Sequence, residues 1–245
     1  MARPRKHLSK APIVEAVIDF RVLLQEQAKS ETFADLSASI GEQYGQNSPL
    51  QSIGARFGIE NGQVVNAVDI PTTVGWRYQS ETEIVQFRIN GFTFSKIAPY
   101  TTWEEVFGEA RRLWDVYLEV YDPKQVSRVA VRYINQMRLD APANLVEYLE
   151  SPPSLPGLIP QTIREFLSRV HVEDRSRGAS AVIVQALEPQ VDSRVISILL
   201  DIDAFRDVNT APTDPTLLSI FQQLRELKND IFFASITEKT VEMYE

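Results

Sequence analysis

Apolar and polar residues alternate along several short segments of this chain, and a period of two residues is typical of a half-buried β-strand. In segment 13–22, alternate residues from Ala16 to Val22 are apolar, whereas Asp19 and Arg21 lie on the other face. The same alternation predicts further strands at 127–139, 163–173, 179–187 and 194–203. We therefore expect β-structure over much of the chain.

Two Asn-Gly dipeptides, Asn61-Gly62 and Asn90-Gly91, each separate a pair of alternating segments. Asn-Gly suits the two positive-φ positions of a two-residue turn, so each dipeptide predicts a β-hairpin. Two successive hairpins between residues 52 and 97 form an antiparallel meander.

Apolar residues spaced three and four positions apart predict two long helices. The first follows Thr101 or Thr102, either of which can cap it, and ends at Asp122. The second is capped by Asp214 or Thr213, has Pro215 in its first turn and ends near Ser235. Short helices are expected at 31–44 and 143–149. The apolar stripe of each long helix is expected to pack on a sheet.

The order of elements repeats, with a strand, a short helix, antiparallel strands and a long helix in each half. Phe107 and Leu113 in the first long helix align with Phe221 and Leu227 in the second. We therefore predict an α+β fold of two tandem, duplicated units, each a helix-grip-like sheet on one long helix, packed tightly together. The expected boundaries are a basic flexible leader at 1–10, units at 11–123 and 124–237, and a C-terminal tail at 238–245.

The residue inventory removes several kinds of chemistry. The 245 residues include no cysteine and two histidines, which excludes disulfides, thiol nucleophiles and cysteine-ligated metals. No glycine-rich phosphate-binding motif is present, so we expect no cofactor. The apolar runs are too short to span a membrane, and no secretory signal follows the first residue. These features predict a cytoplasmic location.

The charge distribution argues against a nucleic-acid partner. The chain has 25 cationic and 33 acidic residues, a net charge of −8. Four of the cations lie among the first ten residues, so the remainder carries 21 cations against 33 acids, a net charge of −12. Such a body repels a polyanion. The basic leader is expected to be solvated, or else to dock on an acidic partner.

The strand at 127–139 carries the main candidate binding residues. Asn135 interrupts its apolar face, and a buried amide needs hydrogen-bond partners. It would either bridge to the backbone of the facing long helix or anchor a ligand in a pocket. Arg132 and Arg138 lie on the opposite face with Arg128, where they would form internal salt bridges or hold a small anionic ligand.

Other candidate ligand-binding residues lie on the long helices. Trp114 and Tyr117 belong to an aromatic stripe that either packs across the sheet or lines a ligand cavity. Asn229, near the end of the second helix, would either break the helix in a left-handed conformation or point into the crevice between the halves.

Asp201 and Asp203 follow an apolar strand, and alternation places both carboxylates on one face. Such a pair is able to share a divalent cation, as in a metal-dependent phosphotransfer enzyme. A nucleotidyltransferase also needs a Gly-Ser turn and a helix before the pair, which this sequence lacks. We therefore expect solvated carboxylates here rather than a metal site.

Several short segments are spread along nearly the whole chain: Ala11 to Arg21, Gly91 to Tyr100, Trp103, Ala110 to Tyr117, Arg132 to Asn135, Leu224 to Asn229, Phe233 and Thr237. With these residues at this spacing, the chain resembles a family of prokaryotic proteins of about this length that is sporadically distributed across distant bacteria and archaea. The resemblance implies no activity, cofactor or catalytic residue. Such a distribution is typical of accessory genes, including toxin–antitoxin and phage-defence loci.

These observations predict a non-catalytic binding or regulatory protein with a protein partner, such as the neutralising partner in a toxin–antitoxin or phage-defence locus. The first alternative is a small-molecule-binding module or enzyme, with a cavity between sheet and long helix lined by Asn135, Tyr117, Trp114 and Arg132. The second is the metal-dependent phosphotransfer enzyme centred on Asp201 and Asp203. A homo-oligomer is compatible with each.

Overall fold

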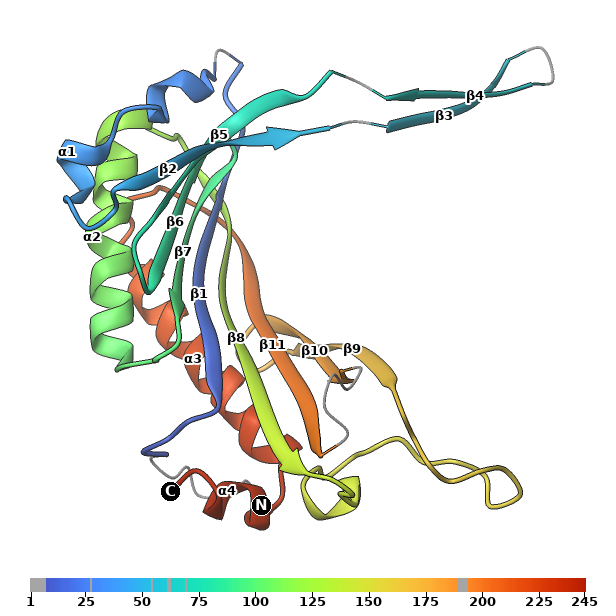
Figure 1. The fold of residues 1–245 in the computed structure, drawn as a ribbon. Coiled ribbons are helices and arrows are strands. Elements are labelled where there is room, and N and C mark those ends of the chain that lie inside the picture. Colours follow the sequence, from blue (N-terminus) through green and yellow to red (C-terminus); the bar gives the residue numbers. More distant parts are fainter. Residues whose placement is uncertain (1–7, 27, 54, 61–62, 69, 189–193) are drawn as a thin grey trace.

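The computed structural model describes residues 8–26, 28–53, 55–60, 63–68, 70–188 and 194–245. These residues form one nine-stranded antiparallel sheet, a two-stranded ribbon and four α-helices. The α+β class and the antiparallel sheet are as predicted. The two long helices lie on the same face of the large sheet (Figure 1).

The strands of the large sheet are β1 (Ile13–Val22), β2 (Gln46–Ser52), β5 (Thr72–Gln79), β6 (Glu83–Arg88), β7 (Gly91–Ile97), β8 (Val126–Asp140), β9 (Phe166–Asp174), β10 (Ala179–Leu187) and β11 (Val195–Thr210). The ribbon consists of β3 (Ala55–Glu60) and β4 (Gln63–Val68). The helices are α1 (Ser37–Ile40), α2 (Trp103–Tyr121), α3 (Thr216–Ser235) and α4 (Glu238–Glu242), with 3-10 helices η1 (Ser30–Phe33) and η2 (Leu145–Glu147).

The strand order is β2-β5-β6-β7-β1-β8-β11-β10-β9, which places β1 and β8 side by side at the centre. Ile18 of β1 lies opposite Val131 of β8. After β1, the four strands β2, β5, β6 and β7 form a meander that returns to β1 through β7, and after β8 the three strands β9, β10 and β11 return to it through β11; a long helix follows each meander. The two parts therefore share one continuous sheet and a similar order of elements, with one more strand in the first part.

Helix α2 has the ends that the sequence predicts. The backbone N–H of Glu105 donates to Thr102 Oγ1 at 3.2 Å, so Thr102, not Thr101, is the cap. Asp122 ends the helix in the left-handed conformation, with φ at 47°. The residues that α2 buries include the aromatic and aliphatic stripe: Trp103, Val106, Ala110, Leu113, Trp114, Val116 and Tyr117.

Three local predictions differ from the structure. The helix expected at 31–44 is divided into η1 and α1, because the Tyr78 hydroxyl donates to the Phe33 carbonyl at 2.6 Å and accepts from the Leu36 N–H at 3.0 Å. The helix break at Asn229 is wrong, since α3 continues to its last residue at 235. The segment expected as a tail at 238–245 contains α4.

The hairpin between β6 and β7 is present, one residue earlier than predicted. Arg88 pairs with Gly91, so the loop consists of Ile89 and Asn90. Gly91 has φ at 156°, and a Cβ atom there would lie 2.3 Å from the Phe20 carbonyl oxygen. Glycine therefore permits the close approach of β7 to β1. The other dipeptide, at 61–62, lies outside the described residues, and its flanking strands pair through Glu60 and Gln63.

Gly91→Ala is expected to lower the free energy of unfolding by about 2 kcal/mol, since the added methyl group must displace backbone rather than a mobile side chain. Urea denaturation measures the change. The matched control is Gly108→Ala in α2, where a Cβ meets nothing within 4 Å. That variant should be more stable than the wild type by about 0.5–1 kcal/mol. Equal effects at the two positions would contradict the explanation.

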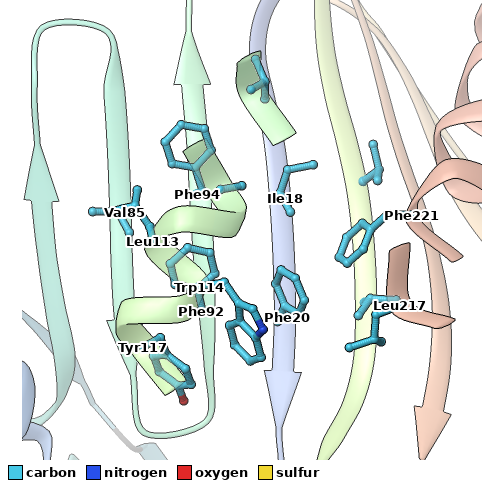
Figure 2. Close-up of a cluster of buried hydrophobic side chains, with 14 of the residues drawn as sticks. Ile18, Phe20, Val85, Phe92, Phe94, Leu113, Trp114, Tyr117, Leu217 and Phe221 are labelled. Atoms are coloured by element: carbon cyan, nitrogen blue, oxygen red, sulfur yellow. The ribbon is translucent and has the colours of Figure 1, made fainter. Parts of the chain in front are cut away.

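One aromatic core joins both helices to the centre of the sheet (Figure 2). The Phe20 ring on β1 stacks on Trp114 of α2 with centroids 4.1 Å apart, and contacts Phe221 of α3 at 4.8 Å. Phe107 of α2 also contacts Phe221, at 5.2 Å. The two halves therefore share hydrophobic contacts as well as strand pairing.

None of the described helices is long and apolar enough to cross a membrane.

Candidate functional site

The candidate residues occupy three different places in the fold. Arg132, Arg138, Asp201 and Asp203 lie on the face of the sheet turned away from α2 and α3, as strand alternation requires. Asn135 and Asn229 line a pocket on the helix side of the sheet. Trp114 and Tyr117 are buried in the aromatic core. The cavity expected to unite Asn135, Tyr117, Trp114 and Arg132 is therefore not formed.

Asp19 is the centre of a set of paired charges on the helix-free face. Its carboxylate accepts from Thr93 Oγ1 at 2.6 Å, from Arg88 Nη2 at 3.1 Å and from Arg21 Nε at 3.0 Å. These groups come from β1, β6 and β7, whose pairing places them on one face. Three donors thus converge on one carboxylate.

The pairing extends across β8 to β11. Arg128 donates to Asp203 at 2.9 Å and lies 3.6 Å from Asp19, so it links two carboxylates. Arg132 forms a bidentate pair with Asp201, at 2.8 and 2.6 Å. The internal salt bridges expected for these two arginines are therefore present. We call this set the arginine–aspartate network; its members are Asp19, Arg21, Arg88, Arg128, Arg132, Asp201 and Asp203.

The centre of the network is largely dehydrated although neither long helix covers it. The side chains of Arg88 and Asp19 are only 15% and 12% exposed. Burial lowers the pKa of Arg88, against the opposing effect of Asp19, and burial raises the pKa of Asp203, against the opposing effect of Arg128. A hollow of about 260 Å³ lies over this region. The network therefore lines a shallow, polar depression.

Asp201 and Asp203 share a face as predicted, but their carboxylates bind arginines. Among the described residues, no group of three or more His, Cys, Asp and Glu side chains is placed to hold a metal ion. Arg138 is exposed and lies farther along β8, opposite Ser197 of β11. The carboxylates therefore balance the charge of Arg128 and Arg132.

The second site is a pocket of about 870 Å³ on the other side of the sheet, between the N-terminal segment, the start of α2, β8 and α3. We call it the helix–sheet pocket. Its polar lining includes Tyr100, Tyr133, Asn135, Arg225, Lys228 and Asn229, the exposed Lys10 and Glu105, and the hydroxyl residues Ser9, Thr101 and Thr102. The two asparagines that the sequence singled out are thus brought together here.

Hydrogen bonds hold the buried polar groups of this pocket in place. The Asn135 amide donates to the Leu200 carbonyl of β11 at 2.9 Å. The bridge to the backbone of the facing helix, one of the two predicted alternatives, is not the bond it makes. The hydroxyls of Tyr100 and Tyr133 are 2.9 Å apart. Burial raises the pKa of both tyrosines, so both hydroxyls stay protonated at neutral pH. Lys228 Nζ lies 3.6 Å from the Tyr133 ring centroid, a cation–π contact.

Trp114 and Tyr117 serve the core instead of a cavity. Trp114 stacks between the rings of Phe20 and Tyr117, with centroids 4.1 and 5.1 Å away. The Tyr117 hydroxyl donates to the Arg88 carbonyl at 2.8 Å, which satisfies its buried oxygen. The aromatic stripe therefore packs across the sheet.

Sequence reasoning did not identify Asp19, Arg88 or Lys228 as site residues. Asp19 and Arg88 occupy ordinary polar positions of alternating strands, and only the strand register brings them together. Lys228 directly follows Leu227 of the apolar stripe, which is the one signal that its side chain points inward.

No protein-family model and no curated protein matches the chain. The class is therefore defined by the fold and the two sites alone. It is an α+β protein whose nine-stranded antiparallel sheet carries a charged face on one side and a helix–sheet pocket on the other.

Proposed function

We propose that the chain is a non-catalytic binding protein that recognises a protein partner on the helix-free face of its sheet. The observation that carries this proposal is the arginine–aspartate network. Dehydrated ion pairs contribute little net stability compared with apolar residues of the same size. A set of directed donors and acceptors on an open face is better explained as a recognition surface.

Two segments beside this face support the proposal. The ribbon of β3 and β4, and residues 151–165 of the segment between β8 and β9, project from the sheet away from α2 and α3 (Figure 1), whereas residues 145–150 pack on the end of α3. Large apolar residues are exposed at or near both segments. Ile53 and Ile70 lie next to the two ends of the ribbon, Leu158 lies in the segment before β9, and Leu167 lies in β9. Large apolar residues exposed on projecting segments are a feature of protein interaction sites.

The charges on this face also favour a protein partner over a nucleic acid. The network has four arginines and three aspartates, so it is close to neutral within a chain of net charge −8. Binding of a nucleic-acid duplex requires many cations that are available to its phosphates, whereas these arginines already have carboxylate partners. A polar protein surface that exchanges hydrogen bonds with the network is the better fit.

We further propose that the protein acts in the cytoplasm as the neutralising partner of a toxin–antitoxin or phage-defence locus, following the resemblance noted above. The repeated succession of a central strand, a meander that returns to it and a long helix supports a duplication of units 11–123 and 124–237, each a helix-grip-like sheet and helix. The absence of thiol, histidine-cluster and phosphate-loop chemistry from the sequence supports a role without catalysis.

Photocrosslinking in the native host tests the proposed face. p-Benzoylphenylalanine is placed at Leu167 on β9, or at Leu218, an exposed residue of α3 in the helix layer. We expect one protein to be crosslinked from position 167 and not from position 218. The purified partner should then bind Leu167→Asp at least about tenfold more weakly than Leu218→Asp, since a charge is introduced into the contact. Crosslinking from position 218 alone, or from neither position, would overturn the proposal.

A further inference from the structure

The helix–sheet pocket is separate from the proposed partner face, because the sheet lies between them. Its volume of about 870 Å³ is that of a site for a small organic molecule. The pocket lies where α3 passes over β8, so a rigid helix and a central strand supply its walls. Such a site is suited to hold one molecule in a fixed orientation.

Among the charged residues described in its lining, cations outnumber carboxylates. Lys228 is only 6% exposed, and a lysine this buried is uncommon in proteins. Arg225 lies three residues earlier in α3, on the same side of the helix. Together with the exposed Lys10, the described residues of the lining provide three cations and one carboxylate, Glu105. Arg225 is also 3.7 Å from Glu104, so part of its charge is already compensated.

The neutral groups of the pocket add a hydrogen-bond donor. Tyr100 and Tyr133 share one hydrogen bond of 2.9 Å, which uses one of the two hydroxyl protons. No described residue accepts the second proton, so it can donate to a ligand oxygen. The Asn229 side chain lines the same wall, one position after Lys228 in α3. Donors next to cations are the arrangement that binds a carboxylate or a phosphate.

Most of the remaining described lining is apolar, apart from Ser9, Thr101 and Thr102. Ile13, Phe232 and Phe233 contribute to the pocket, and the two phenylalanines are largely buried. An inorganic anion would leave this surface without a partner, whereas a molecule with an apolar body would cover it. The ligand therefore needs both an acidic group and an apolar part.

We infer that the helix–sheet pocket binds a small organic anion, with its acidic group at Lys228 and Arg225 and its apolar body against Ile13 and the two phenylalanines. Carboxylates and phosphate monoesters share this chemistry, and competition between them identifies which acidic group is preferred. The inference does not depend on the proposed partner face.

Fluorescence titration with 8-anilinonaphthalene-1-sulfonate, an aromatic anion, tests the inference. We expect saturable binding to the full chain, displaced by benzoate or by phenyl phosphate but not by inorganic phosphate at the same concentration. Lys228→Met retains the apolar stem and removes the charge, so it should weaken binding at least about tenfold. The matched control is Lys124→Met, because the Lys124 side chain is 72% exposed and lies outside the pocket.

Two further measurements keep the result interpretable. If Lys228→Met does not fold, as judged by circular dichroism, Arg225→Gln takes its place with the same expected weakening. Leu167→Asp should bind the dye like the wild type, because Leu167 is not a pocket residue. Dye binding that is absent in the wild type, that stays within twofold in the folded pocket variant, or that falls equally in Lys124→Met would overturn the inference.

Discussion

Asp19→Ala is expected to lower the free energy of unfolding by about 3–5 kcal/mol, because it leaves buried Arg88 without its carboxylate. Thr93 and Arg21 also lose their acceptor. The loss of one member of a buried pair costs more than the pair itself contributes, since the remaining charge stays dehydrated. Equilibrium denaturation in guanidinium chloride measures the change.

The double variant Asp19→Ala/Arg88→Met separates this effect from simple loss of a contact. We expect it to recover much of the stability lost in Asp19→Ala, since no unpaired charge remains in the sheet. Asp115→Ala, at an exposed position of α2, should change stability by less than about 0.5 kcal/mol. A cost below about 1 kcal/mol for Asp19→Ala would mean that water solvates Arg88 in the free protein.

The second large effect is expected for Trp114→Ala, at about 3–5 kcal/mol of lost unfolding free energy. The indole ring stacks on Phe20 and contacts the edge of Phe92, with centroids 4.1 and 5.8 Å away (Figure 2). Its removal leaves a cavity at the point where α2 meets the centre of the sheet. Thermal and urea denaturation both measure the loss.

Trp114→Ala also distinguishes a core residue from a ligand-lining one. A purely structural role predicts that the variant, at a temperature where it is folded, binds the anilinonaphthalene dye within twofold of the wild type. A large loss of dye affinity in the folded variant would show that Trp114 takes part in ligand binding. Asp115→Ala on the same helix is the control for both measurements.

Local pattern was sufficient to predict most elements. Alternation located β1 and β8, and the capping threonine and Asp122 located α2, because these signals act within a few residues. The region 31–44 was mistaken for one helix because its interruption depends on Tyr78, which is more than 30 residues away in the chain. The periodicity of apolar residues within a segment contains no information about a contact with a distant residue.

The site was harder to predict than the fold for the same reason. Arg132 was identified as a salt-bridging arginine because it shares a strand face with other arginines, but its partner Asp201 follows from the pairing of β8 with β11. Asn135 was recognised as a polar residue on an apolar face, and its bond to Leu200 depends on that same pairing. The contact of Lys228 with the Tyr133 ring depends on the orientation of α3 about its own axis. Register and helix rotation are set by the whole core.

The central pairing of β1 with β8 joins residues near positions 13–22 to residues near 126–140. During synthesis on the ribosome, the β1 strand therefore emerges long before its second neighbour exists. Until β8 is made, one side of β1 is an open sheet edge with unsatisfied backbone groups, a template for pairing with another nascent chain. A truncated product that ends at Asp122 would keep this edge permanently, and self-association through it would mimic the missing strand.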